Sequence, residues 1–130
     1  MAYLFDAATL AEVLRSVPSR TLVRRLTGVP TRDRWTSVIS VAQLLIAARK
    51  SNKAKVMQDV IRLVSSVRVS SFDVGAAQAF AKLRATVAPD VDTDDVMVAA
   101  TALANDYTLV TRRPNEFRRF TGLRVEDWVV

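Results

Sequence analysis

The chain has 130 residues, half of them hydrophobic, which is enough for one core and too few for two, so we expect a single domain over residues 1–130. It contains no Cys and no His, which excludes disulfides, thiolate or imidazole metal sites, and catalytic triads built on His. The 19 Lys and Arg residues outnumber the 13 Asp and Glu residues, and the net charge of +6 favours a partner rich in phosphate.

Hydropathy and the first ten residues bear on where the protein works. No apolar run reaches the roughly 18 residues of a membrane span. The opening sequence MAYLFDAATL carries an acid where a secretion signal would carry basic residues. We therefore expect no membrane association and a cytoplasmic location. Without Cys or His, any metal site must consist of oxygen ligands, which suits Mg²⁺ or Mn²⁺.

Short apolar strands alternate with helices from the first residues onward. Tyr3–Phe5 is predicted as a strand that ends at Asp6, and apolar residues at helical spacing follow it. Further strands are predicted over residues 36–40, 67–72, 107–111 and 123–125, and helices over 7–16, 20–26, 41–50, 56–64, from Asp73 to before Pro89, and from Asp95 to 104. This alternation predicts a three-layer α/β/α fold with a central parallel sheet of four or five strands.

The segment from Asp92 to Arg113 organises the rest of the prediction. It reads as a helix with acids in its first turn, a stop at residues 105–106, and a buried strand that ends at Thr111. Because ligands of open α/β sheets gather at the carboxyl ends of strands, Asp6 and residues 111–113 fall on the functional edge. Whether Asp95 reaches that edge depends on how its helix docks.

The basic residues are clustered, which is typical of nucleic-acid binding. One cluster includes Arg24 and Arg25, and another includes Arg112 and Arg113. These four side chains are our candidates for contacts with phosphate. The alternative is that surface Lys and Arg residues only keep a small domain soluble.

Five sequence motifs, in order along nearly the whole chain, resemble those of the PIN domain. They are YLFD at the first strand, SVISVAQL at the second, DVMVAATA at the central helix, TRRPNEF after the next strand, and LRVEDW at the end. In size and layout the chain resembles the VapC-like toxins of toxin–antitoxin pairs.

The resemblance implies an activity and a set of site residues. Members of that family hold Mg²⁺ or Mn²⁺ on clustered carboxylates and hydrolyse RNA. By position, Asp6, Asp95 and Glu116 match the family's acidic ligands, and Gln43 stands where the family has a Glu. The implied partners are RNA and a small antitoxin protein, and the implied assembly is a homodimer.

Three departures from the family pattern predict a partly degraded site. Gln43 replaces a Glu, Ala8 replaces an Asn or Ser, and Arg113 replaces an Asn or Asp. We therefore predict that the Arg113 guanidinium takes the place of metal charge by bridging Asp6 and Asp95, and that Mn²⁺ binds weakly. The alternative function is a catalytically inactive PIN-like module that binds RNA or protein. A flavodoxin-like receiver is disfavoured because the first strand does not end in a pair of acids.

Several of these residues also have purely structural interpretations. Asp73 and Asp94 are predicted to be helix N-caps, whereas Asp6 and Asp95 are assigned to the site. Glu116 has Arg119 as a possible partner three residues on. The two Trp residues, at positions 35 and 128, are predicted to pack in the core rather than to stack on bases.

Overall fold

Five parallel strands form the centre of the molecule in the computed structural model, which describes residues 1–130. Their order across the sheet is β3-β2-β1-β4-β5. The strands are β1 (Tyr3–Phe5), β2 (Arg34–Ser37), β3 (Arg68–Ser70), β4 (Thr108–Val110) and β5 (Val125–Glu126). The predicted parallel sheet of four or five strands is confirmed.

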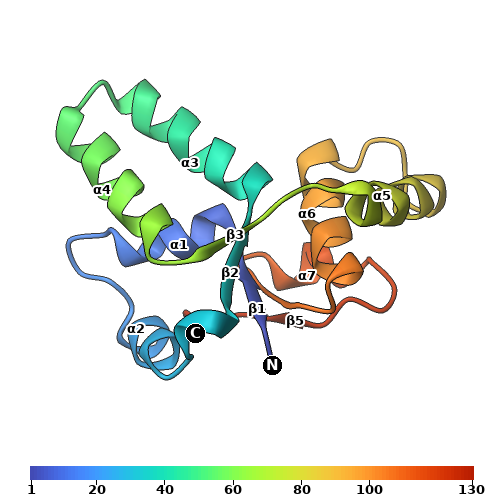
Figure 1. Cartoon of the computed structure of the whole chain (residues 1–130), viewed down its shortest axis with the longest axis horizontal. Coiled ribbons are helices and arrows are strands. Elements are labelled where there is room, and N and C mark those ends of the chain that lie inside the picture. The colour runs from blue at the N-terminus through green and yellow to red at the C-terminus, as the bar shows by residue number, and fades with distance from the viewer.

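Helices cover both faces of this sheet. They are α1 (Ala7–Val13), α2 (Arg20–Thr27), the 3₁₀ turn η1 (Thr31–Asp33), α3 (Val38–Ser51), α4 (Ala54–Ser65), α5 (Val74–Thr86), α6 (Thr93–Ala104) and α7 (Pro114–Phe117). Figure 1 shows α1 to α4 on one side of the strands and α5 to α7 on the other. None of the helices combines the length and the hydropathy needed to cross a bilayer.

Neighbouring residues of the central strands β1 and β4 belong to two separate hydrophobic cores. Leu4 and Leu109 pack with α5, α6 and α7, while Phe5 and Val110 pack with α1 to α4. All four side chains are fully buried. Successive side chains of a strand point to opposite faces, so one residue pair in each central strand serves both layers.

The end of β2 differs from the prediction. The predicted strand over 36–40 is wrong at its carboxyl end, because the Ser37 hydroxyl accepts a hydrogen bond from the Ser40 amide at 2.9 Å and caps α3. The cap converts Val38 to Ser40 from strand to helix. Gln43 therefore lies in the second turn of α3, whereas the sequence analysis had placed it in the first turn.

Helix caps confirm one structural interpretation and correct another. The Asp73 carboxylate accepts a hydrogen bond from the Ala76 amide at 3.0 Å and caps α5, as predicted. Asp94 is not a cap, because α6 begins at Thr93, two residues before the predicted start, with Asp92 at its N-cap position. A guanidinium nitrogen of Arg84 donates to the Val91 carbonyl at 2.9 Å and holds the preceding segment. Asp94 and Asp95 are thereby both placed in the first turn of α6.

Candidate functional site

Asp6 ends β1 and begins α1, and it serves as the N-cap of that helix. Its carboxylate accepts a hydrogen bond from the Thr9 amide at 2.8 Å, and the residue is only 6% exposed. Burial raises the pKa of the Asp6 carboxyl above its ordinary value, and the Thr111 hydroxyl, Thr9 and the charge of Arg113 offset this only in part. Asp6 is therefore both the cap and the buried acid that the sequence placed on this edge.

The start of α1 is attached to the end of β4. The Asp6 amide donates to the Val110 carbonyl at 3.1 Å, and the Thr9 hydroxyl donates to the same carbonyl at 3.3 Å. The next residue, Thr111, is fully buried and accepts a hydrogen bond from the Arg113 amide at 3.0 Å. These contacts bring the loop after β4 to the edge of the sheet where Asp6 lies.

The Arg113 guanidinium joins two acids from different elements. It donates to both carboxylate oxygens of Asp95, at 3.0 and 2.8 Å, and to one oxygen of Glu116 at 2.6 Å. The hydrogen bond to Asp95 raises the pKa of Arg113 still further above its ordinary value, so the group is always charged. Asp95 on α6 and Glu116 on α7 thus converge on one resident cation.

This geometry revises two predictions about partners. The predicted bridge from Arg113 reaches Asp95, but its second acid is Glu116 and not Asp6, which Arg113 influences only through its charge. The possible pairing of Glu116 with Arg119 is wrong, because Arg119 donates to the backbone carbonyl of Glu116 at 2.6 Å. The reason is reach: Glu116 lies three residues after Arg113 in the first turn of α7, and Asp95 in the first turn of α6 comes within 2.8 Å of the guanidinium.

Gln43 contacts an acid that the sequence had assigned to capping. Its side-chain amide donates to Asp94 Oδ2 at 3.1 Å. The contact joins the second turn of α3 to the first turn of α6, so Gln43 does reach the acidic edge. The family's Glu at this position would put a second carboxylate beside Asp94, whereas the amide is a neutral donor.

The acids do not form a ready site for a divalent ion. No group of three or more acidic side chains lies close enough together to hold one metal ion. Carboxylate oxygens are the right chemistry for Mg²⁺ or Mn²⁺, but those of Asp95 and Glu116 already bind Arg113. The arrangement fits a guanidinium and does not fit a divalent ion as it stands, so we assign no chemical step to a metal.

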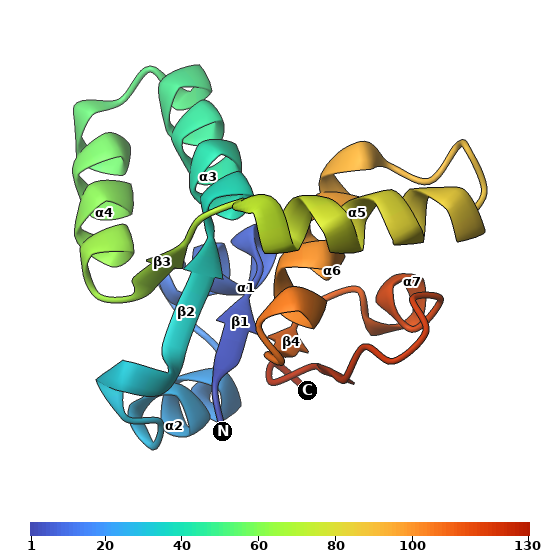
Figure 2. The ribbon, with the colours of Figure 1, turned by 45° about the vertical axis from the view of Figure 1, so that its right-hand side comes forward.

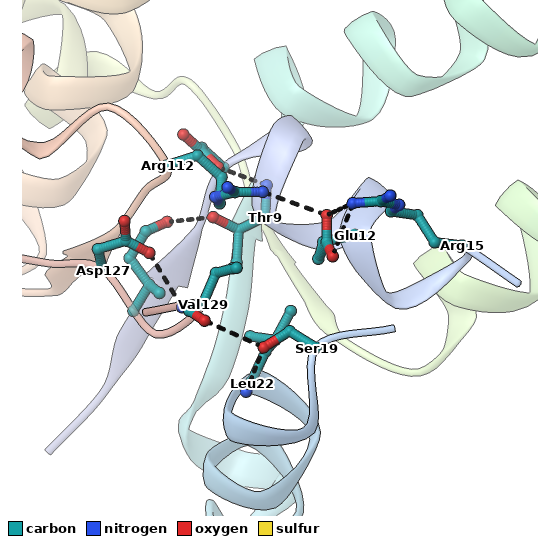
Figure 3. A network of polar contacts seen from close by, with 10 residues as sticks. Thr9, Glu12, Arg15, Ser19, Leu22, Arg112, Asp127 and Val129 are labelled. Atoms are coloured by element: carbon teal, nitrogen blue, oxygen red, sulfur yellow. Dashed lines mark hydrogen bonds and ion pairs between the residues drawn. The ribbon is translucent and has the colours of Figure 1, made fainter. Parts of the chain in front are cut away.

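Glu12 is the acid that the sequence analysis missed. Arg112 approaches its carboxylate at 3.2 Å and Arg15 at 3.3 Å, and Figure 3 shows the two guanidinium groups on opposite sides of it. Asp6, Thr9 and Glu12 are spaced by three and are all buried. That spacing, on a helix whose other face is apolar, was the signal that could have found Glu12.

The four arginines predicted to bind nucleic acid do not form one surface. Figure 2 shows α2, which carries Arg24 and Arg25, toward the end of the sheet where β1 and β2 begin. Arg25 contacts Glu126 at 2.9 Å and stacks 4.4 Å from the Trp128 ring centre. Arg112 and Arg113 lie after β4, each bound to acids, and only Arg24 has no acidic partner. Trp128 is 1% exposed, as expected for a packing residue.

Comparison with known proteins identifies the family. The family model described as "PIN domain" matches residues 3–123. The chain is 33% identical over 96 residues to a tRNA(fMet)-specific endonuclease VapC of Shigella flexneri, covering 71% of this chain and 73% of that protein. Among solved structures, VapBC-1 from nontypeable Haemophilus influenzae superposes with a TM-score of 0.88 at 23% identity, over 100% of both chains. A toxin–antitoxin complex from Klebsiella pneumoniae superposes with a TM-score of 0.74 at 20% identity, over 94% of this chain and 95% of that one. The chain therefore belongs to the PIN domain family and is VapC-like.

Proposed function

We propose that this protein is the toxin member of a toxin–antitoxin pair and that it is an endoribonuclease. Its catalytic acids would be Asp6, Asp95 and Glu116. The observation that carries the proposal is the convergence of Asp95 and Glu116 on one cation beside the buried Asp6, at the carboxyl edge of the sheet. In an open α/β fold that edge is where ligands bind. Gln43 contributes a neutral hydrogen-bond donor through its contact with Asp94.

Two features support RNA as the substrate. The net charge of +6 favours a polyanion, and Arg112 and Arg113 lie on the loop next to the acids. The Shigella relative is a tRNA(fMet)-specific endonuclease, which makes tRNA the substrate class to test first. A divalent ion, Mg²⁺ or Mn²⁺, would supply positive charge for the phosphate only if Asp95 and Glu116, which would hold it, were released from Arg113.

The test measures binding and cleavage of tRNA side by side. Wild-type protein is titrated into labelled tRNA at low and at high salt, and then incubated with tRNA and Mn²⁺. We expect binding that weakens steeply with salt and slow cleavage that Asp6→Asn abolishes without abolishing binding. Absence of binding at low salt would contradict the RNA assignment and would leave a protein partner as the role of the domain.

A second candidate is a catalytically inactive module that binds RNA or protein. It is favoured by the neutral Gln43 and by the Arg113 guanidinium on Asp95 and Glu116. Under this reading the wild type binds RNA but does not cleave it. Cleavage by the double variant alone would identify the wild type as a toxin fold that has lost its chemistry.

The remaining proposals concern assembly and location. Family membership supports a small antitoxin protein as partner, a homodimer and a cytoplasmic location, with residues 1–130 acting as one domain. Co-expression with any small protein encoded in the neighbouring reading frame, followed by light scattering of the purified species, measures both partner and stoichiometry. A monomer that captures no such protein would contradict the assembly.

A further inference from the structure

We propose that the turn between α3 and α4 is a second contact site for the RNA backbone, separate from the acids at the carboxyl edge of the sheet. The site consists of Arg49, Lys50, Asn52 and Lys53, which we call the hairpin tip. The inference rests on the proposed action on RNA and adds the surface that positions a long RNA on the domain.

Most of the net charge of the protein lies on the hairpin formed by α3 and α4. Of the 19 basic and 13 acidic residues, residues 38–65 contain five basic residues and one acid, Asp59, which leaves 14 and 12 for the rest of the chain. The hairpin therefore carries four of the six net positive charges. Charge that serves only solubility is spread over a surface with both signs mixed, whereas a nucleic-acid contact concentrates basic residues in one place.

The basic side chains of the hairpin tip have no counter-charge. The one acid of the hairpin, Asp59, pairs with Lys55 at 3.3 Å and with Arg62 at 3.9 Å, and all three lie in α4. The last turn of α3 contains Arg49 and Lys50, and the first turn of α4 contains no acid. Both of these side chains and that of Lys53 are exposed. A phosphate can therefore meet these charges without displacing a carboxylate.

The turn places the basic side chains around an open hollow. Asn52 ends α3 in the left-handed backbone conformation, with φ of 55°, and α4 begins two residues later. The hollow beside this turn has a volume of about 410 Å³ and is lined by Ala48, Arg49, Asn52, Lys53, Ala54 and Met57. Two cations and an amide thus border a concave surface with a small apolar floor, so that contacts to one phosphate group can converge there.

The hairpin tip and the acids lie on the same side of the sheet. α3 begins directly after the carboxyl end of β2, and Gln43 in its second turn contacts Asp94. Figures 1 and 2 both show α3 and α4 extending away from the strands, with their turn at the far end. Lys50 lies seven residues beyond Gln43, a rise of about 10 Å along the helix. An RNA bound at the carboxyl edge can therefore reach the hairpin tip as well.

The experiment compares two double variants that remove the same charge from the same hairpin. Arg49→Gln with Lys53→Gln removes the two cations that line the hollow, and Lys55→Gln with Arg62→Gln removes the two that pair with Asp59. Binding of labelled tRNA is measured by fluorescence anisotropy over a salt series. We expect the first variant to reduce the slope of log affinity against log salt by about 2, one for each lost phosphate contact, and the second to leave it nearly unchanged.

Amide signals of ¹⁵N-labelled protein locate the contact independently. A short oligouridylate should shift the signals of residues 49–54 in the wild type, and these shifts should be lost in the first variant. An equal fall of slope in both variants would overturn the proposal, because net charge alone would then govern binding.

Two further outcomes separate this proposal from the proposed function. Failure of the wild type to bind tRNA at low salt would overturn both. Binding by the wild type with an unchanged slope in the first variant would overturn only the hairpin tip as an RNA contact. If that variant also lost a small co-expressed protein partner, the hairpin tip would belong to a protein interface instead.

Discussion

Two consecutive arginines leave the end of β4 and bind acids on different elements, and the two ion pairs are built differently. Arg112 binds Glu12 on α1, whose side chain is 8% exposed, and Arg15 supports the same carboxylate. Arg113 binds Asp95, which is 13% exposed, and Glu116, which is half exposed. The first cluster has two cations on one buried acid, whereas the second has one cation on two acids.

This difference in burial and in stoichiometry separates structure from function. Removing a cation from a buried carboxylate leaves a desolvated charge without its partner, which is costly, so the Glu12 cluster is fixed and joins α1 to the loop after β4. The acids of the second cluster outnumber their cation and are wetter, so their pairing is weaker and exchangeable. We therefore expect Arg112 to hold the loop in place and Arg113 to determine what binds there.

The largest effect should follow from removing each arginine in turn. Arg112→Gln leaves buried Glu12 with Arg15 alone, and we expect a loss of about 1–3 kcal/mol in the free energy of unfolding. Arg113→Gln leaves two acids that water can reach, and we expect a loss of less than about 1 kcal/mol. Urea denaturation of the two variants, measured in the same buffer, checks this order. A larger loss in Arg113→Gln would mean that its cluster is the structural one.

The next effect concerns the affinity for divalent ions. Gln43→Glu with Arg113→Asn restores the family's acid beside Asp94 and removes the competing guanidinium. We expect the wild type to bind Mn²⁺ weakly and the double variant to bind it about tenfold more tightly. This factor corresponds to about 1.4 kcal/mol of binding free energy. Calorimetric titration measures it, with Arg112→Gln as the control that changes charge at the other cluster. No gain in the double variant would point to Ala8 as the limiting departure from the family.

Most of the fold could be predicted because strand and helix patterns are local. Every predicted strand exists, and the alternation of strands and helices gave the parallel sheet and its layers. The errors lie at the ends of helices and strands, where a single side chain can determine where the element begins or ends. At Ser37 a hydroxyl that caps α3 outweighs the β-branched run Val38-Ile39, and only the position of the Ser40 amide reveals it.

The site could be predicted only in part, because its partners come from distant segments. Asp6, Asp95 and the charge of Arg113 were evident from strand ends and from the family motifs. The pairing of Gln43 with Asp94 spans 51 positions, and that of Arg112 with Glu12 spans 100, so no local pattern encodes either. Arg113 reaches Glu116 instead of Asp6 because α7 begins at once after Arg113, and this depends on packing that spacing does not show.

A smaller effect should appear in the pH dependence of stability. Burial raises the pKa of Asp6, so the folded protein holds this proton to a higher pH than the unfolded chain, where the pKa is about 4. The stabilising contribution of protonated Asp6 is present below about pH 4 and is lost as pH rises through the raised folded pKa. Asp6→Asn, which keeps the N-cap acceptor, should stabilise the protein at pH 7 by about 0.5–1 kcal/mol.

The measurement compares thermal unfolding of wild type and Asp6→Asn from pH 3 to pH 7. The difference between them should shrink toward low pH, because the wild-type acid is then protonated in both states. Asp73→Asn is the control, since Asp73 is an N-cap of the same kind with a side chain that is not buried. A stability difference that stays constant across the pH range would show that the two variants differ in helix capping and not in the burial of a charge at Asp6.

The smallest expected effect tests whether the contrast between free and paired arginines extends to α2. Arg25 is fixed by Glu126 and by the ring of Trp128, whereas Arg24 has no acidic partner and lines an open hollow with Arg20 and Val17. If phosphate contacts need a free guanidinium, Arg24→Gln should reduce the slope of log affinity for RNA against log salt by about 1, and Arg25→Gln should leave that slope unchanged. Fluorescence anisotropy over a salt series measures both variants.

The effect is small because α2 lies toward the opposite end of the strands from the acids, where a phosphate contact adds to binding without touching the site. An equal loss of slope in both variants would show that Arg25 leaves Glu126 when RNA binds, and that pairing in the free protein does not decide which arginines meet RNA.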